Sequence, residues 1–143
     1  MIAYADTGFL VSLYGQDAHS ATARLLTQNQ PTFLLTPLGE AEFVNALELQ
    51  VFRKEWTRSQ ARTVHNHFLQ HQSTAVIRSE PFPLEAWGRA TVLSRRHGAS
   101  LGARTLDVLH VAVALILKPD LFLTFDKRQS QLAKAEGLRV LPA

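Results

Sequence analysis

The sequence predicts a single α/β domain whose parallel sheet is covered by helices on both faces. Two observations lead to this prediction. Short apolar runs alternate along the chain with longer segments of helical periodicity, which is typical of a buried parallel sheet. The chain has 143 residues, the size of one compact domain, and 46% of them are hydrophobic. No repeat, low-complexity tract or long linker divides residues 1–143, so we expect one domain.

The elements follow from the position of each periodic segment. Strands are expected at residues 2–5, 33–35, 74–78, 121–125 and 138–141. Helices are expected at about residues 8–14, 18–28, 38–53, 57–70, 84–97, 106–117 and 127–136. Gly98 is expected to end the helix at 84–97, and Gly137 the helix at 127–136. The segment 106–117 is apolar nearly all round and is therefore predicted to be a buried central helix.

Composition excludes several classes of protein. The chain has no cysteine, so a disulfide scaffold, a thiolate metal site and a cysteine nucleophile are excluded. The first residues lack the basic segment of a signal peptide, and the most apolar run, VLHVAVALIL, is interrupted by His110 and is too short to span a bilayer. We therefore expect a soluble, cytoplasmic protein that does not enter a membrane.

Four acidic residues stand where a parallel sheet gathers its ligand site. Asp6 and Asp126 each close a predicted strand and open a helix, while Asp107 and Glu42 lie in the first turns of helices. In a parallel sheet these positions meet at one edge, outside the carboxyl ends of the strands. Each acid also has an ordinary explanation: Asp6 and Asp126 are favoured helix caps, Asp107 suits the helix dipole, and a surface glutamate is common.

Several carboxylates at one edge need a cation or raised pKa values, because they repel one another. Mg²⁺ and Mn²⁺ take oxygen ligands and can activate water for phosphodiester cleavage. If the four acids share one cleft, 8 of the 12 acidic residues remain elsewhere, against 15 basic residues. An acidic pocket in a basic body suits a polyanionic substrate held near metal ions.

The spacing leaves some residues undecided. Glu40 lies close to Glu42, and spacing alone does not choose between them. His110 follows Asp107 by three residues and could support the site, but such a histidine is more often a hydrogen-bonded core residue, and we favour that interpretation. His67 and His71 have the i,i+4 spacing of a metal-binding pair; without an acidic ligand nearby in the sequence, we expect them on a solvated face.

These segments together resemble the PIN-domain family, in its branch of VapC-like toxins from bacterial type II toxin–antitoxin modules. The opening YADTGFLVSLY resembles the family's first strand, with Asp6 as the first metal-binding acid and Thr7 beside it. TPLGEAEFVNAL resembles the second block, in which an acid is followed at three residues by asparagine. That register selects Glu42 over Glu40 and places Asn45 in the flank.

The third and fourth blocks follow in order, so the resemblance covers essentially the whole chain. RTLDVLHVAVAL places the third acid at Asp107, and FLTFDKRQSQLAKAEGL matches Thr124 and Asp126 to a hydroxyl and an acid. The resemblance implies a PIN-like three-layer α/β/α fold with a central, mainly parallel five-stranded sheet. It also implies Mg²⁺ or Mn²⁺ dependence, cleavage of single-stranded RNA, a cognate antitoxin that blocks the site, and commonly a homodimer.

On this basis we expect a hydrolytic endoribonuclease in which Asp6, Glu42, Asp107 and Asp126 are both the metal ligands and the catalytic carboxylates. Thr7, Asn45 and Thr124 are expected to support them. Arg104 either contacts the RNA backbone or pairs with an acid.

Three alternatives remain: a flap-type DNA nuclease, a haloacid-dehalogenase-type phosphatase, and a non-enzymatic nucleic-acid-binding or RNA-processing module. The first should need extra helices that this chain lacks. The second usually has another aspartate two residues after its first, where this chain has Gly8. Metal-dependent cleavage distinguishes the third.

Overall fold

The computed structural model describes all residues, 1–143, as one five-stranded sheet flanked by seven helices. The strands are β1 (Ile2–Ala5), β2 (Thr32–Leu35), β3 (Ile77–Ser79), β4 (Leu121–Leu123) and β5 (Val140–Leu141). Their order across the sheet is β3-β2-β1-β4-β5, and every neighbouring pair is parallel. The strand order reverses direction between β1 and β4, and this reversal is the point at which open α/β sheets bind their ligands.

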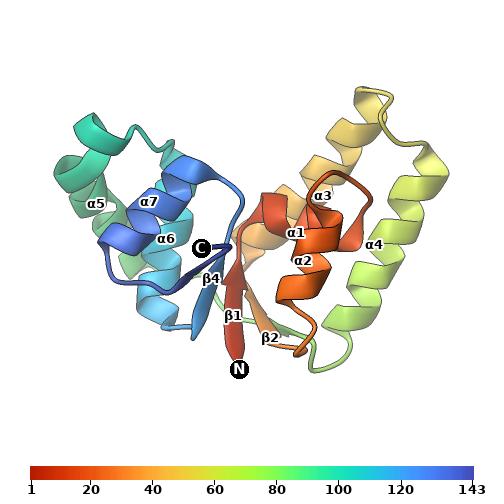
Figure 1. Ribbon diagram of the computed structural model, residues 1–143, viewed down its shortest axis with the longest axis horizontal. Coiled ribbons are helices and arrows are strands. Elements are labelled where there is room, and N and C mark those ends of the chain that lie inside the picture. The colour runs from red at the N-terminus through yellow and green to blue at the C-terminus, as the bar shows by residue number, and fades with distance from the viewer.

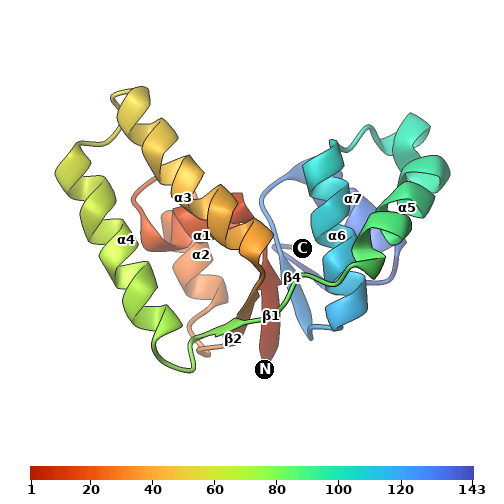
Figure 2. The same cartoon turned by 180° about the vertical axis from the view of Figure 1, so that it is seen from behind.

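The helices form the two outer layers of a three-layer α/β/α fold. They are α1 (Thr7–Tyr14), α2 (Ser20–Leu26), α3 (Pro37–Phe52), α4 (Arg58–Gln72), α5 (Glu85–Leu101), α6 (Thr105–Leu117) and α7 (Lys127–Ala135). Figures 1 and 2 show α1 to α4 on one side of the sheet and α5 to α7 on the other. The predicted α/β/α architecture with a five-stranded sheet is therefore confirmed, and its sheet is wholly parallel.

Alternating side chains of the strands divide the apolar interior into two cores. Ala3 and Ala5 of β1 pack with α1 to α4, whereas Tyr4 between them packs with α5 to α7. This alternation is the ordinary geometry of a strand, whose successive side chains point to opposite faces. Because both faces are covered, the strands carry almost continuous apolar sequence, as a buried parallel sheet requires.

Helix α6 is the buried central helix that its sequence predicts. Every residue from 108 to 114 is buried, against β1, β4 and the neighbouring helices of its layer. Its packing against α5 is the most extensive contact between any two elements. The first turn of α6, by contrast, lies at the carboxyl edge of the sheet and carries the half-buried Asp107. None of the seven helices combines the length and the apolar character that crossing a bilayer demands.

The predicted end of α5 at Gly98 is wrong. The helix continues through Gly98 to Leu101 and ends at Gly102, which has a left-handed φ of 67° and whose N–H donates to the Gly98 carbonyl. A glycine is a strong helix stop only where the chain adopts positive φ, and sequence alone did not show which of the two glycines does so. Gly137 does adopt positive φ, at 89°, directly after α7.

These two glycines generate a matched prediction about stability. A methyl group added at Gly98 or at Gly102 meets no atom within 4 Å, so only the backbone conformation distinguishes the two sites. Gly98→Ala should raise the free energy of unfolding by about 0.5–1 kcal/mol, because alanine favours a helix interior. Gly102→Ala should lower it by about 1 kcal/mol, because a β-carbon strains the left-handed conformation. Urea denaturation of both variants tests this, and equal effects of the same sign contradict the observed helix end.

Candidate active site

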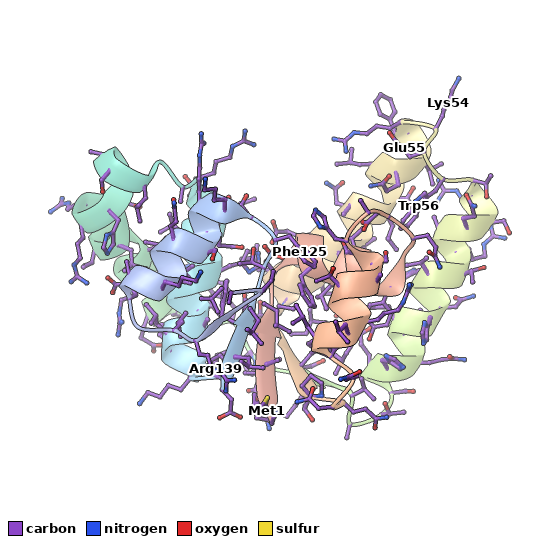
Figure 3. The ribbon with its side chains drawn as sticks, in the orientation of Figure 1. Met1, Lys54, Glu55, Trp56, Phe125 and Arg139 are labelled. Carbon is purple, nitrogen blue, oxygen red and sulfur yellow. The ribbon has the colours of Figure 1, made fainter.

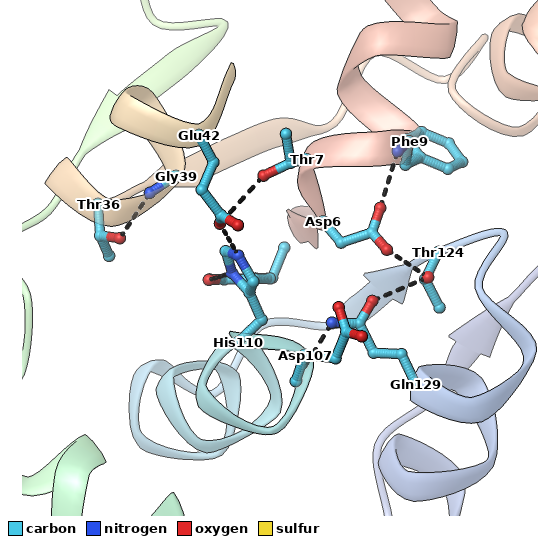
Figure 4. Close-up of polar contacts among 11 residues, drawn as sticks. Asp6, Thr7, Phe9, Thr36, Gly39, Glu42, Asp107, His110, Thr124 and Gln129 are labelled. Carbon is cyan, nitrogen blue, oxygen red and sulfur yellow. Dashed lines mark hydrogen bonds and ion pairs between the residues drawn. The ribbon is translucent and has the colours of Figure 1, made fainter. Parts of the chain in front are cut away.

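Asp6 lies at the centre of the carboxyl edge of the sheet. Its backbone N–H donates to the Leu123 carbonyl at 3.0 Å, which continues the β1–β4 ladder one residue past the strand. Its carboxylate is the N-cap of α1, accepting from the Phe9 N–H at 2.7 Å, and its other oxygen accepts from the Thr124 hydroxyl (Figure 4). With only 7% of its surface exposed, Asp6 is a carboxylate almost withdrawn from water.

Burial raises the pKa of Asp6 to about 6. The hydrogen bonds from Thr124 and Phe9 oppose this rise, and the negative charge of Asp107 adds to it. The protein alone therefore does not fully compensate the charge of Asp6, because removal from water outweighs the donors that surround the carboxylate.

Thr124 and Gln129 hold Asp6 in place from the other side of the β1–β4 junction. The Thr124 hydroxyl lies within hydrogen-bond distance of both the Asp6 carboxylate and Gln129 Oε1, and it accepts the Asp126 N–H at 2.9 Å. Its single proton can go to Asp6 when that carboxylate is ionised, or to Gln129 when Asp6 is protonated and itself donates. Gln129 Nε2 also donates to the Asp107 carbonyl at 3.2 Å, so this side chain ties α7 to α6.

Asp107 is a half-buried carboxylate to which no group of the protein donates a hydrogen bond. It lies in the first turn of α6, and α6 has no side-chain cap. Burial raises the pKa of Asp107, the charges of Asp126 and Glu42 raise it further, and His110 and Arg104 oppose the rise. Asp107 therefore lies within the electrostatic range of the other predicted acids.

Glu42 reaches the same region from α3. It accepts a hydrogen bond from the Thr7 hydroxyl at 3.2 Å and a second one from His110 Nε2. The Nδ1 atom of His110 lies 2.6 Å from the Tyr4 hydroxyl, whose pKa is raised far above its usual value, chiefly by burial. Tyr4 therefore stays protonated and donates to His110, which donates to Glu42. His110 is thus a satisfied buried residue, as predicted, but the acid that it contacts belongs to the candidate site.

Glu40 is placed differently from Glu42. It is exposed, and its carboxylate accepts from Gln72 of α4 at 2.8 Å, away from the other acids. Asn45 is also exposed and lines a depression of about 510 Å³ with Glu40 and Glu48. The predicted support of the acids by Asn45 has no counterpart among the hydrogen bonds of the structure. On α3 the Glu42 side chain is partly buried, whereas the Asn45 side chain is exposed.

Basic side chains border the outer part of the site. Arg104, Lys127 and Arg128 line a pocket of about 360 Å³ together with Asp107 and Asp126. Arg104 forms no ion pair with any of the acids, although its charge lowers the pKa of Asp107. Of the two predicted roles of Arg104, direct pairing with an acid is therefore not observed. Asp126 is exposed at this border and caps α7, accepting the Gln129 N–H at 2.8 Å.

Gln129 and Tyr4 are part of the site that sequence reasoning did not identify. Gln129 stands three residues after Asp126, where a capping box places its glutamine, and this spacing was the available signal. The Gln129 side chain instead points inward, fully buried, because the Asp126 N–H is already bonded to Thr124. Tyr4 lies in an apolar strand, and nothing in its neighbouring sequence indicates a polar partner.

The chemistry of the four acids fits a hard divalent cation, since all of their donor atoms are carboxylate oxygens. In the described conformations, however, no three acidic or histidine side chains converge closely enough to hold an ion. Glu42 is directed toward His110 and Thr7, and Asp6 toward Phe9 and Thr124 (Figure 4). The donor atoms of these residues thus suit a metal ion. In the described conformations the carboxylates are instead bonded to protein partners, apart from that of Asp107, which is unpaired.

Comparison with known families now bears on this arrangement. The sequence profile of the family described as "PIN domain" matches residues 3–135, nearly the whole chain and a range that contains the positions of all four acids. The chain belongs to the PIN-domain family. No curated protein sequence matches significantly.

Solved structures of similar fold cover this PIN domain from end to end. VapC20 of Mycobacterium tuberculosis, described as a sarcin–ricin loop cleaving toxin, has a TM-score of 0.68 at 20% identity, with 95% of each chain covered. VapBC2 of Rickettsia felis, solved with a DNA fragment from its promoter, gives 0.65 at 15% identity, over 98% of this chain and 97% of that one. FitAcB of Neisseria gonorrhoeae gives 0.64 at 15%, over 98% and 96%. At these identities the likeness establishes a shared fold.

The raised pKa of Asp6 predicts how the metal-free PIN domain responds to pH. A folded-state pKa of about 6 lies above the unfolded value of 3.8, so the native state binds this proton more tightly. The stability that Asp6 contributes is therefore fully present below about pH 4 and is lost as pH rises through 6, by about 3 kcal/mol in all. Relative to wild type, Asp6→Asn should gain stability across this range, since asparagine also caps helices well.

Urea midpoints in EDTA between pH 4 and 7.5 measure the difference between wild type and Asp6→Asn. Glu40→Gln, which alters an exposed carboxylate that does not contribute to the pKa of Asp6 or Asp107, is the matched control and should keep the wild-type midpoint profile. If the wild-type and Asp6→Asn profiles run parallel, Asp6 does not titrate in this range.

Proposed function

We propose that this PIN domain is a metal-dependent endoribonuclease that hydrolyses single-stranded RNA, and that it acts as the toxin of a toxin–antitoxin pair. The observation that carries the proposal is the position of Asp107. Its half-buried carboxylate receives no hydrogen bond from the protein. The charges of Asp126 and Glu42 raise the pKa of Asp107, and the charge of Asp107 raises the pKa of Asp6. A protein that only needed helix caps has no reason to place such a group there, because an uncompensated carboxylate costs stability.

Asp6, Glu42 and Asp107 are proposed to hold the principal divalent ion, Mg²⁺ or Mn²⁺, and Asp126 to complete the acidic site directly or through water. A bound ion of this kind lowers the pKa of water and stabilises the charge that develops on the phosphate. Hydrolysis would proceed by in-line attack of water on the phosphorus, with the bond to the opposite ribose oxygen breaking and that oxygen taking up a proton.

The chain's own residues set the orientation of these ligands. Thr124 holds Asp6, and Gln129 holds Thr124 and the start of α6 together. The Tyr4–His110 pair positions Glu42, with Thr7 on the other side of the same carboxylate. Hydrogen bonds of this kind restrict the orientations of ligand side chains and tune their basicity.

The basic border of the site suits an RNA strand. Arg104, Lys127 and Arg128 lie beside Asp107 and Asp126, so a phosphate next to the reacting one can be neutralised without leaving the acidic edge. Such contacts are independent of base identity and position the backbone. We therefore propose that Arg104 contacts the RNA backbone, the other of its two predicted roles.

The binding-module alternative explains only half of the acids. Asp6 and Asp126 cap α1 and α7, but Asp107 and Glu42 cap no helix.

The toxin role follows the resemblance to VapC-like proteins and the VapC20 description as a toxin. A cognate antitoxin is proposed as the protein partner. In support, Leu84 and Trp87, which lie three residues apart at the start of α5, are large apolar side chains that are 78% and 58% exposed, as at sites of protein contact. A homodimer is proposed on the resemblance alone.

Asp107→Asn and Asp6→Asn test the nuclease directly. Both keep the shape of the side chain and remove a charged metal ligand, so each should reduce Mg²⁺- or Mn²⁺-dependent cleavage of a single-stranded RNA to background. Cleavage is followed on labelled oligonucleotides, and circular dichroism checks that each variant is folded. Activity of a folded variant within about tenfold of wild type would show that its carboxylate is not a catalytic ligand.

Glu42 and Glu40 provide an internal pair on the same helix. Glu42→Gln should weaken metal binding and cleavage, most strongly at low Mg²⁺, whereas Glu40→Gln should change neither, because Glu40 is bonded to Gln72 at the surface. Thermal melting with Mn²⁺ gives a second readout: a hundredfold excess over the dissociation constant stabilises a one-site protein by about 2.7 kcal/mol. A larger loss of activity or of stabilisation in Glu40→Gln reverses the assignment.

A further inference from the structure

A second cavity, of about 680 Å³, lies on the opposite edge of the sheet from the four acids. It is lined from α1, α2, α4 and the segments that lead into β2 and β3. Thr32, the first residue of β2, is part of its wall and pairs with Ile2 at the start of β1. Asp6 stands four residues further along β1, about 13 Å away at the rise of a strand. The cavity is therefore separate from the candidate active site.

No acidic residue lines this cavity, and its titratable residues are one arginine and two histidines. Arg24 is held there by one bond from its Nη2 to the Gly15 carbonyl, at 2.8 Å, which leaves its remaining N–H groups free. His67 and His71 follow one turn apart on α4 with their ring centroids 4.5 Å apart. Three positive or potentially positive side chains without a carboxylate form an environment that favours an anion.

Tyr14 fixes the hydrogen bonding of His71. The Tyr14 hydroxyl is bonded to His71 Nδ1, and burial raises the pKa of Tyr14 well above its usual value, so the phenol keeps its proton and donates it. Burial and the neighbouring charge of His67 lower the pKa of His71. His71 is partly buried, whereas His67 is exposed, as expected from the sequence. His71 therefore accepts at Nδ1 and retains Nε2–H as a donor.

The remaining wall of the cavity is apolar and partly flat. Leu13, Pro31, Phe33 and Val76 supply apolar surface, and the ring of Tyr14 stands edge-on to both histidine rings. The volume is within the range of about 300–1,000 Å³ that is usual for small-molecule sites. A ligand that fits both parts combines a negatively charged group with a flat, weakly polar ring.

We propose that this cavity is a second binding site for a nucleoside monophosphate, with the phosphate bound by Arg24 and the two histidines and the base against the apolar wall. A metal ion fits less well, because only two imidazoles are present, one of which is bonded to Tyr14, and no carboxylate completes a ligand set. The phosphorylated nucleoside can be a free mononucleotide or the 5′-phosphorylated end of an RNA strand, since the two present the same groups. The inference does not depend on the proposed nuclease activity.

The test is isothermal titration of the intact protein with the four ribonucleoside 5′-monophosphates in EDTA, which removes divalent ions from the acidic site. At least one monophosphate should bind saturably at millimolar concentration or below, and more tightly than its unphosphorylated nucleoside and than inorganic phosphate. Arg24→Gln should weaken this binding at least tenfold through loss of a charge-assisted hydrogen bond. Arg62→Gln, which removes the same charge from the exposed surface of α4 outside the cavity, is the matched control and should bind as wild type does.

Two further arms separate this site from the active site and identify the source of the ligand. Asp107→Asn should bind the monophosphate as wild type does, and Arg24→Gln should cleave RNA as wild type does. A 5′-phosphorylated oligonucleotide that competes with the mononucleotide identifies an RNA end, and failure to compete identifies the free nucleotide. Absence of binding, equal binding of the nucleoside or of phosphate alone, or binding that Asp107→Asn abolishes and Arg24→Gln leaves intact each overturns the proposal.

Discussion

The burial of one carboxylate at the end of the central strand determines the rest of the carboxyl edge. β1 is paired on both sides, the Asp6 N–H bond to the Leu123 carbonyl extends its pairing with β4, and the Asp6 side chain is almost withdrawn from water. Ionised carboxylates are costly in such a place unless donors or cations surround them. The start of α1 and the Thr124 hydroxyl supply donors. These donors do not fully compensate the negative charge of Asp6, and the pKa of Asp6 is therefore raised.

The same edge gathers further negative charge. α6 is packed on all sides beyond its first turn, so its position is fixed by the core, and that position brings Asp107 to within the electrostatic range of Asp6. Glu42 is held from the opposite layer by His110, which is itself a core residue of α6. The two hydrophobic cores, one on each face of the sheet, thus together fix the positions of the acids. The acids repel one another at this edge only while both cores stay packed. A cation at this edge relieves the repulsion that the packing imposes.

Much of this could be predicted from the sequence because strand ends and apolar periodicity are local properties. The five strands, the buried α6 and the presence of acids at the strand ends all follow from short stretches of chain. The partners of those acids do not, since they come from distant segments: Thr124 is 118 residues from Asp6, and His110 is 68 residues from Glu42. The end of α5 required knowledge of which glycine adopts positive φ, and Asn45 required knowledge of how α3 is rotated. Neither is encoded in composition or spacing.

Helix capping and ligand binding were competing explanations of Asp6 and Asp126 at the level of sequence, but the structure shows that the cap uses only one carboxylate oxygen of each residue. In both residues Oδ1 accepts the backbone N–H of the first turn, and the second oxygen is not part of the cap. The second oxygen of Asp6 faces Thr124, whereas that of Asp126 has no hydrogen-bond partner within the protein. The side chain of a capping aspartate is thus already oriented, because the helix fixes one of its oxygens and leaves the other outside the cap. The cap reduces the conformational freedom that an ion would otherwise have to remove, and it does so without consuming the ligand.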